Sequence, residues 1–460
     1  MAKQTAKKPT SARTTTPLYL LTEKQYKTWL TKRPAAEKSW LKAQGFEAKA
    51  HQHCTLPNAK GGIATVVCGA GEAANMWLLG DISSKLPKGK YSIANEKDIN
   101  NLDAVYLGYQ LGRYQFDAYK KAPKLPAEIT PPKAVNKAEA KRLADSAYLA
   151  RDMVNSTAND MNPAAMVEQI KVVGKQYNAK VKVVTGKPLE TGWPAVHAVG
   201  KASVVPPALV DLTWGNAKHP KVTLVGKGVT FDTGGLNIKT GNYMGLMKKD
   251  MGGAAAALAT AKAVMDAKLP VRLRLLIPTV ENAIAGNAMR PSDVIQTRAG
   301  LTVEVGNTDA EGRLILCDAL HEADQEKPDL LVDFATLTGA ARVALGTDVP
   351  AFFTDSDALA TQLSKTSTSA EDPLWRLPLI DHYAKKLTSQ VADINNDAGT
   401  GYGGAISAAL FLKRFVAKTK NWVHIDMMGW NMESRPGRPK GGEAHAVRAI
   451  YQLIKEYKTR

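Results

Sequence analysis

The sequence contains little cysteine: only Cys54, Cys68 and Cys317 occur among 460 residues. Three scattered cysteines without a CxxC pair cannot form a disulfide scaffold, and they favour a reducing compartment. No apolar run approaches the roughly 18–20 residues needed to cross a bilayer, and no apolar segment near the N-terminus is typical of a secretory signal. These absences predict a soluble, cytoplasmic protein that does not interact with membranes.

Several familiar catalytic and nucleotide-binding motifs are also missing. The segment GKGVTFDTGG (226–235) has glycines and a lysine but not the GxxxxGK[ST] order of a phosphate-binding loop, and the GxGxxG match GTGYGG (399–404) does not directly follow an apolar strand-like run. The metal-binding helix motif HExxH and the serine motif GxSxG are absent as well. Nucleotide binding and serine nucleophile chemistry are therefore disfavoured.

Positive charge is abundant and uneven. The formal net charge is +18, and residues 1–150 hold 24 Lys and Arg against 12 Asp and Glu, which leaves +12 in the first third of the chain. Such a region can attract nucleic acid by counterion release. A solvated, lysine-rich surface is the simpler interpretation, because no known nucleic-acid motif accompanies the charge.

Length and composition predict an α/β protein with two domains, since 460 residues with 44% hydrophobic content exceed one ordinary domain. The smaller N-terminal α/β domain is expected to precede a C-terminal catalytic domain, whose central mixed, mainly parallel sheet is flanked by helices. The expected divisions are a flexible basic tail at 1–16, an N-terminal domain at 17–134, a bridging helix and linker at 135–159, and a catalytic domain at 160–460.

Apolar runs at 62–69 and 104–111 predict strands in the first domain, and the proline-containing stretch 121–132 predicts a stiff, extended connector. Leu143, Ala147, Ala150 and Val154 then follow helical spacing, so this helix is expected to bridge the domains. Asn162-Pro163 predicts the capped start of the next helix.

Beyond residue 160, apolar strands alternate with helices, which is typical of a parallel sheet covered on both faces. The expected strands are 180–184, 221–228, 271–280, 301–305 and 329–337, and the expected helices are 252–267 and 311–324. In such sheets, ligands bind at the carboxyl ends of the strands.

Chemistry-bearing residues gather in three segments: GKGVTFDTGGLNIKT (226–240), KKDMGGAAAA (248–257) and GNTDAEGRL (306–314). They supply four carboxylates, two lysines and an arginine: Asp232, Asp250, Asp309, Glu311, Lys227, Lys239 and Arg313. Converging carboxylates repel one another unless cations share the site, and paired divalent metals are a recurring arrangement for hydrolysis. Lys227 could become a ligand if it is held neutral, while Lys239 and Arg313 could stabilise negative charge or hold an anion.

With these residues in view, the chain resembles the leucyl (cytosol) aminopeptidases of family M17, whose hallmark NTDAEGRL stands unaltered at 307–314. The resemblance implies a metal-dependent aminopeptidase that forms a homohexamer and binds two divalent ions per subunit, Mn or Zn. By motif position, Lys227, Asp232, Asp250 and Glu311 would hold one ion, and Asp232, Asp309 and Glu311 the other. Arg313, with backbone near Gly312 and Leu337, would hold a bicarbonate, and Lys239 would polarise the peptide carbonyl.

The resemblance also implies a pocket for the first side chain of a peptide substrate, formed by Met247, Thr336, Gly339 and the segment 424–431. Met428 stands where the family usually has alanine, and GGEAHAV (441–447) replaces the usual GATGRPV. These departures predict a shallower pocket. Its preference is still expected to be for apolar side chains of the leucine type. Two alternatives stay open: a DNA-binding or architectural hexamer on the same scaffold, and a dipeptidase for Cys-Gly or similar substrates.

Overall fold

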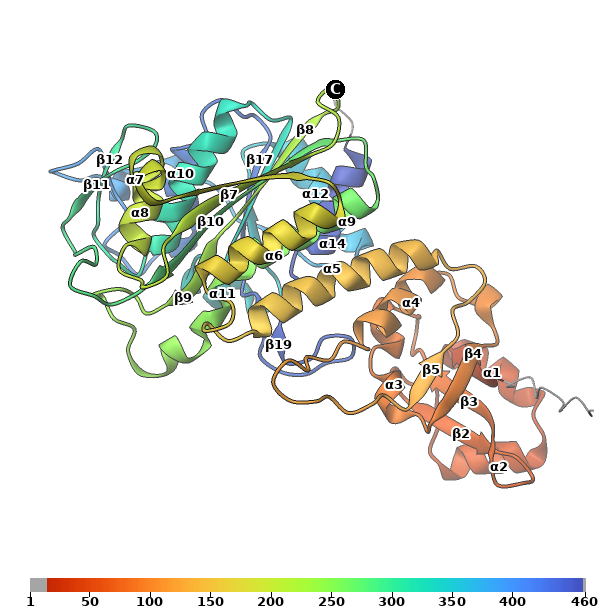
Figure 1. Cartoon of the computed structure of the whole chain (residues 1–460). Coiled ribbons are helices and arrows are strands. Elements are labelled where there is room, and N and C mark those ends of the chain that lie inside the picture. Colours follow the sequence, from red (N-terminus) through yellow and green to blue (C-terminus); the bar gives the residue numbers. More distant parts are fainter. Residues whose placement is uncertain (1–14, 458–460) are drawn as a thin grey trace, which may run out of the picture. The chain divides into compact units, whose positions relative to one another are not determined.

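A computed structural model describes residues 15–457, which form two compact units (Figure 1). The first comprises residues 15–141 with Arg435–Arg438, and the second comprises Arg142–Ser434 with residues 439–457. The tail predicted at 1–16 lies outside the described residues except for its last two, and Thr16 already begins a strand. The other predicted domain boundaries stay predictions. Within residues 15–457, no helix has the length and apolar character needed to cross a bilayer.

The first unit contains a five-stranded sheet in the order β2-β3-β1-β4-β5. Its strands are β1 (Thr16–Leu21), β2 (His53–Pro57), β3 (Ile63–Gly69), β4 (Gly89–Ile93) and β5 (Ala127–Ile129). Its helices are α1 (Glu23–Thr31), α2 (Ala35–Ala43), α3 (Ile82–Lys85) and α4 (Leu102–Leu111), with 3-10 turns at Met76–Leu79 and Glu96–Asp98. The apolar run at 62–69 forms β3 as the sequence predicts.

The prediction of a strand at 104–111 is wrong, because this run forms helix α4. Seven of the ten residues of the helix are buried, and Val105, Tyr106 and Tyr109 among them lie in the core of the unit. A helix buried on nearly all sides shows no polar face, so its sequence resembles that of a buried strand. Gly108 permits close packing, since a Cβ there would lie 1.7 Å from the carbonyl oxygen of Met76.

The stretch 121–132 is not only a connector, because β5 lies within it and pairs in parallel with β4. β5 is an edge strand, a position that tolerates neighbouring prolines since one side needs no partner. The helix predicted after it is α5 (Lys137–Asn155), and the two units divide inside this helix between Lys141 and Arg142. Helix α6 (Pro163–Gln176) starts as predicted: the side chain of Asn162 accepts a hydrogen bond from the Ala165 backbone at 3.1 Å.

The second unit is built on a nine-stranded mixed sheet, which confirms the predicted fold class. Eight of its strands follow the order β15-β14-β17-β13-β8-β10-β7-β6, and the ninth, β9, pairs with β10. The strands are β6 (Lys180–Thr185), β7 (Ala208–Trp214), β8 (Lys221–Gly226), β9 (Gly228–Asp232), β10 (Arg272–Asn282), β13 (Leu330–Ala335), β14 (Ala351–Phe353), β15 (Trp375–Arg376) and β17 (Trp422–Asp426). The central strands β10, β8, β13 and β17 run parallel, and antiparallel pairs occur toward both edges.

Helices cover both faces of this sheet (Figure 1). On one face α6 and α9 (Gly252–Asp266) pack on the strands, with α14 (Val447–Glu456) against α9 and α12 (Asp357–Ser369) against α14. On the other face lie α8 (Pro194–Gly200) and α10 (Glu311–Gln325), with α7 (Gly186–Gly192) and α13 (Gly404–Lys413) packed against them. The second unit also contains α11 (Gly339–Leu345), the short strands β18 (Trp430–Asn431) and β19 (Gly441–Gly442), and 3-10 turns at Gly241–Met251 and Asp381–Leu387.

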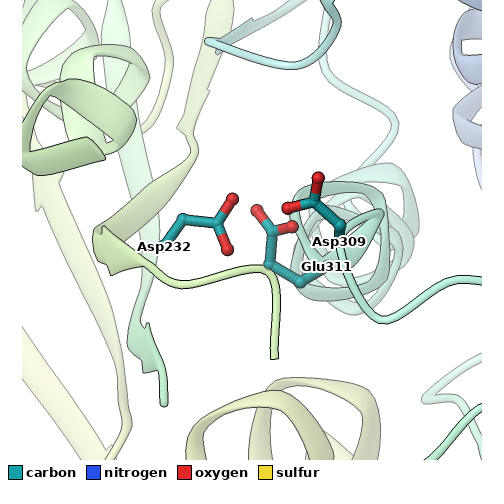
Figure 2. A group of neighbouring side chains, drawn as sticks. All are labelled: Asp232, Asp309 and Glu311. Atoms are coloured by element: carbon teal, nitrogen blue, oxygen red, sulfur yellow. The ribbon is translucent and has the colours of Figure 1, made fainter. Parts of the chain in front are cut away.

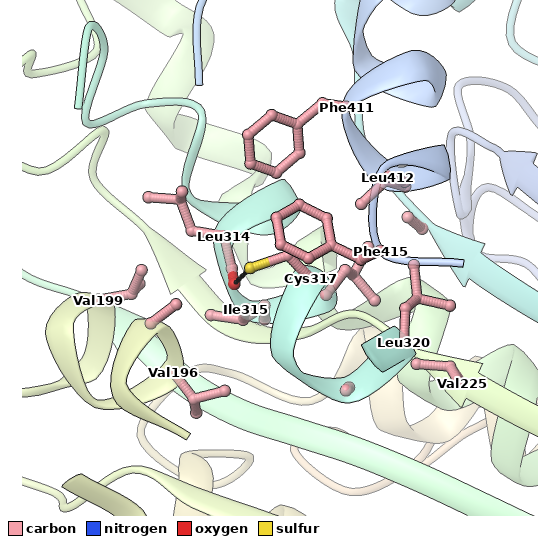
Figure 3. Close-up of a cluster of buried hydrophobic side chains, with 14 of the residues drawn as sticks. Val196, Val199, Val225, Leu314, Ile315, Cys317, Leu320, Phe411, Leu412 and Phe415 are labelled. Carbon is pink, nitrogen blue, oxygen red and sulfur yellow. Dashed lines mark hydrogen bonds between the residues drawn. The ribbon is translucent and has the colours of Figure 1, made fainter. Parts of the chain in front are cut away.

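A large core cluster of the second unit holds α10 in place (Figure 3). Leu314, Ile315 and Cys317 are fully buried among side chains from α8, β8 and α13. The Cys317 thiol donates to the carbonyl oxygen of Leu314 at 3.0 Å. Because the first turn of α10 carries Glu311 and Arg313, this core fixes the position of two predicted site residues.

One predicted strand belongs to a different sheet than expected. The run 301–305 contains β12 (Thr302–Glu304), which pairs with β11 (Val294–Gln296) and β16 (Ile394–Asn395) in a separate three-stranded sheet. β12 is only three residues long and partly buried, so it lacks the continuous apolar run of a central strand. The loop carrying Asp309 therefore approaches the main sheet from this small sheet.

Candidate metal centre

The candidate site lies where the central strands β8 and β13 end. Lys227 separates β8 from β9, and its backbone N–H donates to the Phe334 carbonyl of β13 at 2.9 Å. Its side chain is 3% exposed and runs beneath the first turn of α10. A Cβ at Gly312 would lie 2.4 Å from Cε of Lys227, so only glycine lets this turn approach so closely.

Asp232 ends β9 and is held by two donors. The backbone N–H of Gly234 and the side-chain amide of Asn282 donate to its Oδ1 at 2.9 and 2.8 Å. Gly234 has φ +86°, a left-handed conformation that glycine adopts without strain. The other oxygen, Oδ2, lies 2.8 Å from Nζ of Lys239. The turn therefore fixes one oxygen of Asp232 and leaves the second facing the site.

Asp309 lies in the loop between β12 and α10, and Glu311 is the first residue of α10; hydrogen bonds hold this loop in place. The Thr308 hydroxyl donates to the Gly234 carbonyl at 2.6 Å, which joins this loop to the one carrying Asp232. Asn396 accepts from the backbone of Gly306 at 2.8 Å and donates to that of Asn307 at 2.8 Å. Two loops distant in sequence are thus fixed together by side-chain to backbone hydrogen bonds.

Asp250 approaches from the 3-10 turn before α9. Its Oδ1 accepts from the Thr336 hydroxyl at 2.9 Å, and its Oδ2 lies 2.6 Å from Nζ of Lys227. The same amine lies 2.9 Å from Oε1 of Glu311. Burial alone would lower the pKa of the Lys227 amine, but Asp250 and Glu311 hold that pKa above its ordinary value.

Three carboxylates face one another in this site. Each of Asp232, Asp309 and Glu311 offers an oxygen, and these oxygens all lie within 4.8 Å of one another (Figure 2). Burial and the charge of Asp232 raise the pKa of Glu311 to about 8. The same two causes raise the pKa of Asp309 to about 6. Asp309 and Glu311 therefore keep their protons to a higher pH than isolated carboxyl groups do.

These residues fit divalent metal ions. Oδ2 of Asp250 and Oε1 of Glu311 are buried and accept no hydrogen bond of normal geometry, although Lys227 lies close to both. Buried carboxylate oxygens without donors are costly unless a cation compensates them. An oxygen-rich set with one amine is compatible with Mn, Zn, Mg or Co.

The two predicted catalytic side chains also reach the site. Lys239 donates to Asp309 and contacts Asp232, and these acids hold the pKa of its amine above the ordinary value against the opposing effect of burial. Arg313 donates through Nη1 to the Asn396 carbonyl at 2.6 Å, and its buried Nε has no acceptor within residues 15–457. Burial lowers the pKa of this guanidinium.

A cavity of about 510 Å³ opens above the acids. Most of the predicted site residues line it: Lys227, Asp232, Lys239, Met247, Asp250, Asp309, Arg313, Thr336, Leu337 and Gly339. Glu311 lies buried beneath it in contact with Lys227. Gly312 and Met428 are not among its lining residues, so the structure does not support Met428 as a wall of this cavity. The Leu337 N–H, expected near an anion, donates to Asp426 at 3.0 Å.

Sequence reasoning missed several residues that shape the cavity or its loops. Asn282 and Asn396 hold the loops, and Asp426 accepts from the backbone of Leu337 and Thr338. These contacts join residues about 50 to 90 positions apart, and no local motif indicates them. Lys249 and Arg342 line the cavity as well. The only sequence signal for Lys249 was its place beside Asp250.

Fold and site together define a protein of the M17 class, a family of hydrolases that act as exopeptidases. A family model described as the cytosol aminopeptidase family, catalytic domain, matches residues 148–451, and the M17 aminopeptidase N-terminal domain matches residues 16–132. The chain therefore belongs to the cytosol aminopeptidase family, whose members are metal-dependent aminopeptidases.

Individual relatives agree with this assignment. A probable cytosol aminopeptidase of Geobacter sp. (strain M21) is 40% identical over 370 residues, 77% of this chain and 75% of that protein. One from Aquifex aeolicus (strain VF5) is 39% identical over 363 residues, 76% of this chain and 73% of that protein. The crystal structure of cytosol aminopeptidase from Coxiella burnetii is 46% identical, with a TM-score of 0.94 over 97% of this chain and 98% of that one.

A structure bearing a metal is also similar. The bottromycin maturation enzyme BotP in complex with Mn is 34% identical, with a TM-score of 0.85 over 96% of this chain and 98% of that one. A protein of this fold thus binds manganese, which agrees with the donor set described above.

Proposed function

We propose that this protein removes the N-terminal residue of peptides by hydrolysis with two divalent ions, Mn or Zn. The observation that carries the proposal is the convergence of Asp232, Asp309 and Glu311 within 4.8 Å, beside two buried carboxylate oxygens that Lys227 approaches without a hydrogen bond of normal geometry. A pair of divalent ions compensates such a cluster and serves hydrolysis.

Five side chains would hold the two ions. Lys227, Asp232, Asp250 and Glu311 would share one, and Asp232, Asp309 and Glu311 the other. The contacts support this division, because Lys227 lies against Asp250 and Glu311, while Asp309 lies on the far side near Lys239. As a ligand, Lys227 must lose its proton, and the charge of nearby ions would favour that loss.

When bound, divalent ions supply a Lewis acid that activates water at neutral pH, and bicarbonate supplies a proton acceptor. Lys239 would release Asp309 and donate to the carbonyl oxygen of the scissile peptide bond, where negative charge develops. Arg313 would bind the bicarbonate, and its buried Nε without an acceptor supports this role. Because the Leu337 N–H is bonded to Asp426, the anion would depend chiefly on Arg313.

The first residue of the peptide would lie in the cavity with its free α-amine toward the acids. An acetylated amine is neutral and larger, so it could not take that place. The side chain would contact Met247, Thr336 and Gly339 on the cavity wall. The apolar, leucine-type preference predicted from the sequence depends on Met247, since Met428 does not line the cavity.

We also propose a homohexamer, in line with the family resemblance. Large apolar side chains exposed on the second unit support self-association: Val343 is 90% exposed and Tyr402 is 84% exposed. Sedimentation velocity would test this proposal, and a monomer at micromolar concentration would contradict it.

The peptidase activity is tested by stripping the protein of metal and restoring Mn or Zn. Metal-dependent release of leucine from leucine amide, with no release from N-acetyl-leucine amide, is expected. Asp250→Asn should lose metal and activity together, whereas Lys239→Ala should keep metal and lose rate. Equal cleavage of the acetylated substrate would refute the requirement for a free amine.

A further inference from the structure

Two cations in the cavity have no role in the metal centre. Lys249 and Arg342 both line the cavity, from the turn before α9 and from α11. The Lys249 side chain is only 2% exposed. Nη1 of Arg342 is buried and has no hydrogen-bond acceptor in the described part of the chain.

The other cations of the cavity are already matched. Lys227 contacts Asp250 and Glu311, and Lys239 contacts Asp232 and Asp309. Arg313 donates to a backbone carbonyl, and the charge of Asp397 acts on it. Asp232, Asp309 and Asp397 thus act on other cations, and Asp250 is shared between Lys227 at 2.6 Å and Lys249 at 3.7 Å.

Lys249 and Arg342 themselves have weak or no anionic partners. Lys249 lies 3.7 Å from Oδ1 of Asp250, an oxygen that already accepts from Thr336. Arg342 forms no ion pair with any acid between residues 15 and 457. Lys249 is buried and Arg342 is half-buried, and two like charges that line one cavity are unfavourable unless an anion joins them.

Resting on the proposed function, we propose that the cavity also accepts an acidic first residue, and that it prefers glutamate and aspartate to their amides because Lys249 and Arg342 bind the side-chain carboxylate. Arg342 lies beside Gly339, where an added Cβ would meet its Nη2 at 3.9 Å, and Lys249 and Thr336 both approach Oδ1 of Asp250; Thr336 and Gly339 are residues expected to contact the first side chain. Methylene groups of glutamate would pack on Met247, and the carboxylate would reach the guanidinium. Bound divalent ions would neutralise the four acids of the centre and leave the cavity more positive still.

The same chemistry could serve a different carboxylate, the free C-terminus of a dipeptide. The position of the cations beside Thr336 and Gly339 favours the side chain of the first residue. Substrates with a blocked C-terminus separate the two sources, because only the side-chain carboxylate is then present.

The test compares kcat/KM of the Mn-loaded full-length protein for the p-nitroanilides of Glu, Gln, Asp, Asn and Leu. Glu should exceed Gln by about 10- to 100-fold, the range expected for hydrogen bonds to charged groups. Equal rates for Glu and Gln would overturn the proposal. Faster cleavage of Leu-Ala than of Leu-Ala amide, without a preference for Glu, would assign the cations to the C-terminus and would also overturn it.

Variants locate the effect. Arg342→Met and Lys249→Met remove charge but keep a long side chain, and each should lower the ratio of Glu to Gln by about ten-fold. Arg342→Glu should raise the rate for N-terminal lysine relative to norleucine, a gain that a merely structural role would not produce. Lys365→Met, on the exposed surface of α12, is the matched control and should leave every ratio unchanged.

A binding measurement separates this inference from the proposed function. If the Mn-loaded protein cleaves none of the substrates, the proposed peptidase function fails, and calorimetry of free L-glutamate against L-glutamine then decides. Tighter binding of glutamate by about ten-fold would uphold the cation site. Equal binding, or none, would overturn it.

Discussion

The buried ion pair between Arg151 and Glu443 gives a sharp prediction for stability. Nη2 of Arg151 lies 3.1 Å from Oε1 of Glu443, and the two side chains are 0% and 5% exposed. Asn431 donates to the other oxygen of Glu443 at 2.6 Å. Glu443 belongs to the segment 441–447 in which the sequence departs from the family pattern, so the pair secures an unusual part of the chain.

The magnitude follows from the pKa of Glu443. Burial alone would raise this pKa, but the charges of Arg151 and His445 lower it to about 2 from an ordinary value of 4.5. The pKa of Glu443 is thus about 2.5 units lower in the folded state than in the unfolded state, which corresponds to roughly 3 kcal/mol of stability at neutral pH. Breaking a buried pair costs about 3–5 kcal/mol by experience with other proteins, which agrees.

Glu443→Gln should therefore lower the free energy of unfolding by roughly 3 kcal/mol at pH 7. Because the folded-state pKa lies below the unfolded value, the stabilisation is complete above pH 4.5 and fades as the pH falls toward 2. Urea unfolding of wild type and variant between pH 7 and 4 measures the difference. The exposed pair of Glu168 and Lys171 provides a control, since Glu168→Gln should cost less than about 1 kcal/mol.

This reasoning would be refuted if the difference in free energy of unfolding between wild type and Glu443→Gln disappeared already near pH 6. Glu443 would then take up its proton in the folded state far above pH 2, and the ion pair would contribute little. A difference in free energy of unfolding below about 1 kcal/mol at pH 7 would also show that the ion pair contributes little.

Four further outcomes are expected. Gly312→Ala places a Cβ 2.4 Å from the Lys227 side chain, so bound metal measured by mass spectrometry should fall at least about ten-fold while circular dichroism stays unchanged. Asn162→Ala removes the cap of α6 and should cost about 1 kcal/mol in urea unfolding. Phe411→Ala empties a fully buried site and should cost about 3–5 kcal/mol in the same assay. Cys317, buried with its pKa raised well above the ordinary value, should react with Ellman's reagent only after unfolding.

Much of the second unit was predictable because its strands are continuous apolar runs. β8, β10 and β13 lie within or close to the predicted ranges, since buried parallel strands carry a strong local signal. The acid-bearing loops were identified for a related reason, because glycine turns directly after such strands mark the carboxyl edge of a sheet.

The wrong predictions concern segments whose local sequence is compatible with two kinds of structure. Helix α4 is buried on nearly every side, so its residues resemble those of a strand. β5 depends on pairing with β4, which the prolines around it conceal. Neither feature depends on a local pattern, and tertiary packing decided both.

The support around the site could not be read from the sequence at all. Asn282 and Asn396 hold loops about 50 and 90 positions away, and their side chains are ordinary amides until the fold brings them there. Arg342 could not be predicted either, because its charge reaches the cavity only through the packing of α11. Sequence thus indicated the acids, and folding determined what surrounds them.

The most direct test of the central claim is the number of manganese ions bound by the metal-stripped chain, counted by electron paramagnetic resonance of the free ion during titration. Two ions per chain are predicted for the wild type, with Asp250→Asn and Glu311→Gln each losing at least one. A wild-type chain that binds no manganese, or variants that still bind two ions with unchanged affinity, would contradict the account.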